Sequence, residues 1–87
     1  MGLNFPNASR SYDATRRAVR FWGYDSAMEW SFFVTEDALK HVHSAMHGDE
    51  AGMLAAFDAH RDLICTVAVK VFRREQKGSY ELGVADF

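Results

Sequence analysis

A run of aromatic and β-branched residues between positions 19 and 35 constrains the fold more than any other part of this chain. Apolar and polar side chains alternate over residues 19–22 and again over residues 28–35, a period of two that is typical of β-strands. Both strands nevertheless carry large side chains on both faces. Because a hairpin alone cannot bury two apolar faces, we expect helices to cover one face and another group to shield part of the second.

The two faces of this predicted hairpin differ in composition. The face that we expect to point toward the helices carries Val19, Phe21, Trp30, Phe32 and Val34. The opposite face carries Arg20, Trp22, Tyr24 and Phe33, with Glu29 and Ser31. Residues 23–27 are predicted to form the turn between the strands.

The segments around the hairpin predict two helices and two short strands. Residues 3–5 alternate in character and precede Pro6, which favours a very short edge strand, and residues 7–15 are predicted to be a polar loop. Thr35 is a plausible N-cap for a helix that reaches about residue 46, with Gly48 placed to end it.

A second helix is expected from Glu50, capped by Asp49, to about residue 74. Residues 66–72 also alternate like a strand, but we favour helix because no Gly or Pro interrupts residues 54–76. After a turn at residues 77–79, residues 80–85 alternate as a final strand. The sequence thus predicts one domain over residues 1–87, an α+β fold with a small, mainly antiparallel sheet in strand-strand-helix-helix-strand order and two helices packed on one face.

Short motifs spread over nearly the whole chain resemble DUF1488, a family of small bacterial domains of unknown function. The motifs are Phe5-Pro6-Asn7, Ser9-Arg10, Tyr12-Asp13, Val19-Arg20-Phe21-Trp22-Gly23, Phe57-Asp58-Ala59-His60-Arg61, Gly78-Ser79-Tyr80 and Asp86-Phe87. The resemblance implies a compact α+β fold and a bacterial cytosolic setting. It implies no activity, and it identifies no site residue.

Composition and charge give little support to a nucleic acid or a membrane as partner. The 10 Lys and Arg residues are outnumbered by 12 Asp and Glu, for a formal charge of −2, so no general attraction for polyanions is expected. No apolar run approaches the roughly 20 residues of a membrane span. The chain begins without a secretion signal, and its lone Cys65 cannot form an internal disulfide. We therefore expect a cytoplasmic protein.

The candidate chemical groups are sparse. His43 and His47 stand four residues apart on a predicted helix, a spacing that can bring two imidazoles to one metal ion. No cysteine pair or Glu-flanked motif completes such a site, so we predict no metal and no cofactor. Cys65 is expected to act as a small apolar side chain. No catalytic triad or phosphate-binding loop is present, and no catalytic residue is assigned.

Arg61 lies at the edge of the apolar arc of the second predicted helix. We expect its stem to cover the core and its guanidinium to pair with a carboxylate, while a clamp for a substrate carboxylate or phosphate is the alternative. The second reading would make the chain a small enzyme, the least favoured of three functional classes.

The most unusual local composition combines Arg10, Arg16, Arg17 and Arg20 with Tyr12, Trp22, Tyr24 and Phe33. The favoured hypothesis is a non-enzymatic protein-interaction module, with a homodimer as one form of it, that uses the second hairpin face; its candidate contact residues are Arg20, Trp22, Tyr24, Phe33 and Arg61. The alternative is weak binding of single-stranded nucleic acid through Arg16, Arg20, Trp22 and Phe33.

Overall fold

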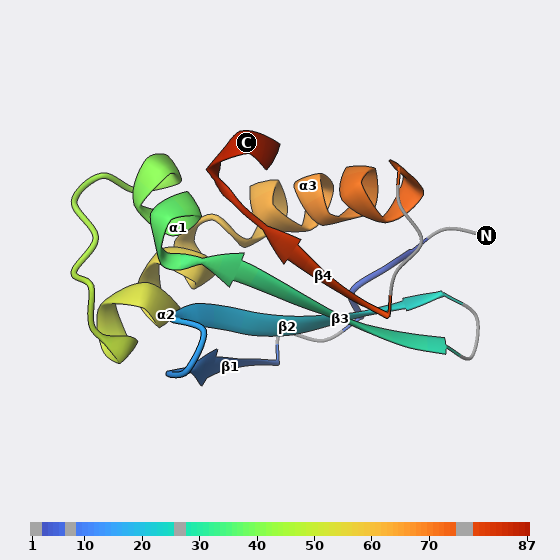
Figure 1. Ribbon diagram of the computed structural model, residues 1–87, viewed down its shortest axis with the longest axis horizontal. Coiled ribbons are helices and arrows are strands. Elements are labelled where there is room, and N and C mark those ends of the chain that lie inside the picture. The colour runs from blue at the N-terminus through green and yellow to red at the C-terminus, as the bar shows by residue number, and fades with distance from the viewer. Residues whose placement is uncertain (1–2, 7–8, 26–27, 75–77) are drawn as a thin grey trace.

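The computed structural model describes residues 3–6, 9–25, 28–74 and 78–87. Its four-stranded sheet has the order β1-β2-β3-β4 (Figure 1). The strands are β1 (Arg10–Asp13), β2 (Ala18–Asp25), β3 (Met28–Thr35) and β4 (Ser79–Leu82). The first three strands pair antiparallel, and β4 runs parallel to β3. The structure confirms the predicted α+β fold with a mainly antiparallel sheet.

The helices are α1 (Glu36–Val42), α2 (Glu50–Ala59) and α3 (Arg61–Arg74), followed after β4 by the short 3-10 helix η1 (Val84–Asp86). Figure 1 shows α3 along one side of the sheet, with α1 and α2 near the left end. All three α-helices supply buried residues to a single apolar cluster. They therefore pack on one face of the sheet, as the hairpin pattern predicts.

The core is built around the predicted inward face of the hairpin. Val19, Phe21, Phe32 and Val34 are buried, and Trp30 packs against them while partly exposed. The ring of Phe21 lies 5.5 Å from that of Phe32 and 5.0 Å from that of Phe57 in α2. Contacts at these separations add favourable ring geometry to the burial of apolar area.

The prediction of one helix over residues 50–74 is wrong, because the chain bends at His60 between α2 and α3. The His60 N–H is shared between the carbonyls of Ala56 and Phe57, and its own carbonyl accepts the N–H of Ile64. A straight 25-residue helix would extend about 37 Å, as long as the whole molecule at 36 Å. The bend lets Phe57 and Ile64 enter the same core. No Gly or Pro marks it in the sequence.

The prediction of a loop over residues 7–15 is also wrong in part, since Arg10–Asp13 forms β1 along the edge of β2. The proposed strand at residues 3–5 is reduced to one antiparallel bridge between Asn4 and Tyr24. Residues 10–13 and Asn4 depart from the prediction for the same reason. These short segments become extended only where the edge of β2 offers unpaired backbone groups.

Three predicted boundaries also shift. Helix α1 ends at Val42 rather than near residue 46, although Met46 is still buried. Strand β2 continues through Gly23 to Asp25, so the predicted turn starts too early, and residues 26–27 of that turn lie outside the described residues. Strand β4 ends at Leu82, because Gly83 leads into η1.

Candidate functional site

The face of the sheet opposite the helices, called the open face below, is the main candidate surface. Strand register places Ser11, Arg20, Trp22, Tyr24, Glu29, Ser31, Phe33, Ser79 and Glu81 on it, and Arg16 joins them from the turn at residues 14–17. None of these residues belongs to the apolar cluster that the helices share with the sheet. The open face is thus a second, separate surface of the same hairpin.

Arginine side chains cover the aromatic centre of the open face. The Cζ atom of Arg16 lies 4.1 Å above the centroid of the Phe33 ring, and that of Arg20 lies 4.9 Å from the Trp22 ring and 5.9 Å from Phe33. Phe33 is consequently only 7% exposed, whereas Trp22 and Tyr24 are half-buried. Such guanidinium–ring contacts are attractive by about 0.5 to 1 kcal/mol at exposed sites.

Polar contacts fix the open face further. Arg20 donates to Ser31 Oγ at 3.0 Å, and the Tyr24 hydroxyl donates to Glu29 Oε2 at 2.9 Å. Within the described part of the chain, Arg20 Nε is buried without a hydrogen-bond partner. A buried donor without a partner costs free energy, which opposes the attraction between the guanidinium and the rings. Arg20 is therefore held by its ring contacts and by Ser31, with one of its N–H groups left without a hydrogen bond.

Arginines occupy only one end of the open face, whereas carboxylates lie at both ends. Arg16 and Arg20 lie toward the end of the hairpin at Ala18 and Thr35, and Glu29 lies at the opposite end, paired with Tyr24. Glu81 stands beside Phe33 on β4. Asp13, which neighbours the turn, approaches Arg16 to 3.7 Å. The arginine end therefore also carries two carboxylates, the opposite end carries Glu29, and the surface is not basic overall.

Two of the four clustered arginines serve the scaffold instead. Arg10 forms a two-pronged contact with Asp58 of α2, at 2.9 Å from Nε and 2.8 Å from the terminal nitrogen. The Asp58 carboxylate contributes through hydrogen bonding and charge to raising the pKa of Arg10. This pair fastens β1 to α2 and helps to explain why residues 10–13 are ordered as a strand.

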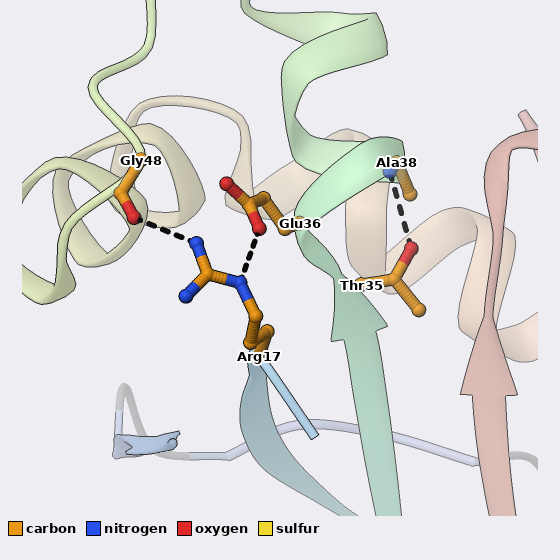
Figure 2. A network of polar contacts seen from close by, with 5 residues as sticks. All are labelled: Arg17, Thr35, Glu36, Ala38 and Gly48. Atoms are coloured by element: carbon orange, nitrogen blue, oxygen red, sulfur yellow. Dashed lines mark hydrogen bonds and ion pairs between the residues drawn. The ribbon is translucent and has the colours of Figure 1, made fainter. Parts of the chain in front are cut away.

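Arg17, the second of these arginines, links three segments of the chain. Figure 2 shows its guanidinium donating to Glu36 Oε1 at 2.7 Å and to the Gly48 carbonyl at 3.3 Å. Beside it, Thr35 Oγ1 accepts the Ala38 N–H at 3.2 Å and confirms the predicted N-cap. Arg17 thus joins the β1–β2 turn to the start of α1 and the approach to α2. The sequence signal for this pairing is Glu36, an acidic residue in the first turn of the helix that follows the hairpin.

Arg61 lies apart from the open face, at the first position of α3. One of its terminal nitrogens is 3.5 Å from the Phe5 carbonyl. With residues 58–63 it lines a shallow depression of about 360 Å³. The Asp58 carboxylate there is bound by Arg10. Arg61 thus has neighbours in α2, in α3 and at Phe5. The other four candidate residues, Arg20, Trp22, Tyr24 and Phe33, lie on the open face.

The histidines and the cysteine also differ from a simple helical arrangement. Because α1 ends at Val42, His43 and His47 do not share a helix, and the ring of His43 faces His60 instead. Cys65 is half-buried, and burial raises the pKa of its thiol, with Asp62 adding to this and Arg61 opposing it. Within the described ranges, no group of three or more His, Cys, Asp or Glu side chains converges as a metal site would.

Comparison with known proteins decides the family. The model of the family described as "Protein of unknown function (DUF1488)" matches residues 3–82. The chain belongs to the DUF1488 family. A crystal structure of a DUF1488 protein of unknown function from Shewanella loihica PV-4 is similar to it, with a TM-score of 0.82, 17% sequence identity, and coverage of 93% of this chain and 91% of the other. At this sequence identity, the similarity shows a shared fold.

No curated protein matches this DUF1488 chain. Among its described residues, no helix is both long enough and apolar enough to cross a membrane.

Proposed function

We propose that this DUF1488 chain is a non-enzymatic interaction domain that self-associates through the open face. The observation that carries the proposal is the position of Arg20 and Glu29 near opposite ends of that face, with the half-buried ring of Trp22 between them and that of Tyr24 beside Glu29. Within the described residues, α1, α2 and α3 all join the cluster on the other face and leave this one uncovered by a helix. Aromatic and arginine side chains are the types most enriched at protein interfaces.

A second copy of the chain fits this charge pattern. Two sheets can pack face to face with their strands roughly aligned. A two-fold axis lying between the sheets and perpendicular to β2 would set the arginine end of one copy over the Glu29 end of the other. Each copy would then contribute the same patch, as a two-fold interface requires. The ring of Trp22, midway between the levels of Arg20 and Glu29, would lie at the centre, where contact residues contribute most.

Single-stranded nucleic acid fits the same face less well. Arg10 and Arg17 are held by Asp58 and Glu36. The open face therefore keeps two arginines, Arg16 and Arg20, together with the carboxylates of Glu29 and Glu81. Stacked Arg and aromatic groups suit bases, but the phosphates between bases would meet a surface without excess positive charge. For an enzyme built on Arg61, the neighbouring Asp58 carboxylate is already bound by Arg10.

A charge-exchange experiment tests the self-association. Analytical ultracentrifugation between 10 and roughly 300 µM should show a dimer for the wild type, within the range of modest interfaces. Arg20→Glu and Glu29→Arg should each be monomeric, because like charges would meet across the interface. Mixing the two variants should restore the dimer, since opposite charges face each other in the mixed pair. Lys70→Glu, on the exposed side of α3, is the control and should dimerise normally.

The outcomes separate self-association from binding of single-stranded nucleic acid. A wild type that stays monomeric throughout this range, or variants that dimerise as well as the wild type, would overturn the proposal. Binding of labelled single-stranded oligonucleotides by the monomer, weakening steeply with salt and lost in Arg20→Glu, would establish the nucleic-acid alternative instead. Circular dichroism on each variant checks that it is folded.

A further inference from the structure

Two histidines from separate segments meet on the helical side of the molecule, away from the open face. His43 Nδ1 lies 3.1 Å from His60 Nε2, with the ring centroids 5.2 Å apart and the rings inclined by 61°. Both side chains are half-buried. This pair plays no part in the self-association proposed above.

Each histidine is the C-terminal cap of a helix. The backbone N–H of His43 donates to the Leu39 carbonyl at 2.9 Å, which closes α1. The N–H of His60 donates to Ala56 and Phe57, each at 3.2 Å, which closes α2. The two backbones are therefore fixed by independent hydrogen bonds, and only the side-chain torsions remain to set the ring positions.

The separation of the two nitrogens suits a metal ion. Imidazole nitrogens bind Zn²⁺ at about 2.0 to 2.1 Å, so two such ligands stand about 3.3 Å apart at a tetrahedral angle and about 2.9 Å apart at a right angle. The observed 3.1 Å falls between these values. In the metal-free protein the same two nitrogens can share one proton, one ring donating and the other accepting. Replacing that proton by a metal ion also requires the rings to turn, because nitrogens that share a proton point along the line between them, whereas two metal ligands point at a common third position.

We infer that His43 and His60 form a two-ligand site for a divalent transition-metal ion of the Zn²⁺ or Ni²⁺ class. Imidazole nitrogen is a favoured ligand of these ions. Since no third His, Cys, Asp or Glu converges within the described residues, water completes the coordination and leaves positions open to an exchangeable ligand. The bound ion links the end of α1 to the junction of α2 and α3, and so stabilises the folded state.

Calorimetric titration of the full chain with Zn²⁺ and, separately, Ni²⁺ at pH 7.5 tests the site. We expect one equivalent to bind and the melting temperature to rise with metal concentration. His43→Gln and His60→Gln, whose amides can keep a polar contact, should each weaken binding at least tenfold. His41→Gln and His47→Gln, at exposed positions, should bind like the wild type.

NMR spectroscopy of the wild type alone also tests the site, and this test does not depend on whether the variants fold. Substoichiometric Ni²⁺ should broaden the imidazole NMR signals of His43 and His60 before those of His41 and His47. The absence of binding at a hundred micromolar metal would overturn the inference. It would equally be overturned by loss of binding in His47→Gln, or by broadening centred on His41 and His47.

Discussion

The guanidinium of Arg17 and the carboxylate of Glu36 meet at 2.7 Å, and the same two residues share a backbone hydrogen bond of 3.0 Å from the Glu36 N–H to the Arg17 carbonyl. Arg17 has a positive φ of 49°, the left-handed conformation that side chains other than glycine seldom adopt. The backbone conformation of Arg17 is thus unfavourable, whereas its side chain makes favourable contacts that join the turn to α1 and to Gly48.

Arg17→Ala and Arg17→Gly separate these two contributions. Both lose the ion pair, but only alanine keeps a Cβ in the left-handed region, so Arg17→Ala should be less stable than Arg17→Gly by about 0.5 to 1 kcal/mol. Urea unfolding gives the free energies. Arg73→Ala, at an exposed position of α3, should leave the stability nearly unchanged. Equal stabilities for the two Arg17 variants would mean that the backbone is not strained at this residue.

The same ion pair makes a contribution to stability that depends on pH. The hydrogen bond from Arg17 lowers the pKa of Glu36 below its ordinary 4.5, and the positive charges of Arg17 and Lys40 act in the same direction. A carboxyl whose pKa is depressed by folding stabilises the protein fully above pH 4.5, and this contribution is lost as the pH falls through the lower, folded-state value.

We therefore expect Glu36→Gln to reduce stability at pH 7 and to lose less stability than the wild type between pH 5 and pH 3. Urea unfolding at each pH measures both quantities. Glu50→Gln, at the exposed start of α2, is the matched control. A wild type and a Glu36→Gln variant with parallel pH profiles would show that the ion pair contributes nothing to folding.

Gly52 is required by its surroundings although it lies in a helix. A Cβ at this position would collide with the backbone carbonyl oxygen of His47 and with the Asp49 carboxylate that caps α2. Alanine is the better helix former by about 1 kcal/mol, yet we expect Gly52→Ala to destabilise by about 1 to 3 kcal/mol because the loop before α2 must shift. Thermal and urea unfolding measure this, and a more stable Gly52→Ala would contradict it. Gly83→Ala, whose Cβ meets nothing within 4 Å, should be nearly neutral.

Cys65 should be a slowly reacting thiol. Burial is the main cause of its raised pKa, and only the thiolate form is a strong nucleophile. At pH 8 we expect its reaction with a disulfide reagent to be much slower in the native protein than in the same protein unfolded by guanidinium. A native rate equal to the unfolded rate would assign Cys65 to an exposed, reactive position.

Prediction from the sequence succeeded where local pattern and burial agree. The alternation of Val19 and Phe21 with Arg20 and Trp22 assigns each to the correct face, because a strand turns its side chains by a fixed half-turn per residue. The capping role of Thr35 followed from its own chemistry and that of the next two residues. These are properties of short segments, and they hold in any fold that contains them.

Other features depend on partners distant in the sequence. Arg10 and Arg17 look identical to Arg16 and Arg20 in the sequence, yet Asp58 and Glu36 hold the first two while ring contacts hold the second two. The separation of 48 residues between Arg10 and Asp58 leaves no local signal. The alternation predicts which side chains share one face of the hairpin, but the charge pattern of that face could not be deduced before the arginines had been assigned.

The sequence by itself determined the elements that periodicity encodes: a two-faced hairpin and an α-helix after Thr35. Residues 66–72 were compatible with helix or strand, and the structure places them in α3. Only the tertiary structure decided where the long apolar segment bends, which edge segment becomes β1, and that His43 meets His60. Periodicity fixes the direction of a side chain relative to its own element. The bend and the two pairings depend on packing several elements around one core, a condition that no local stretch of sequence contains.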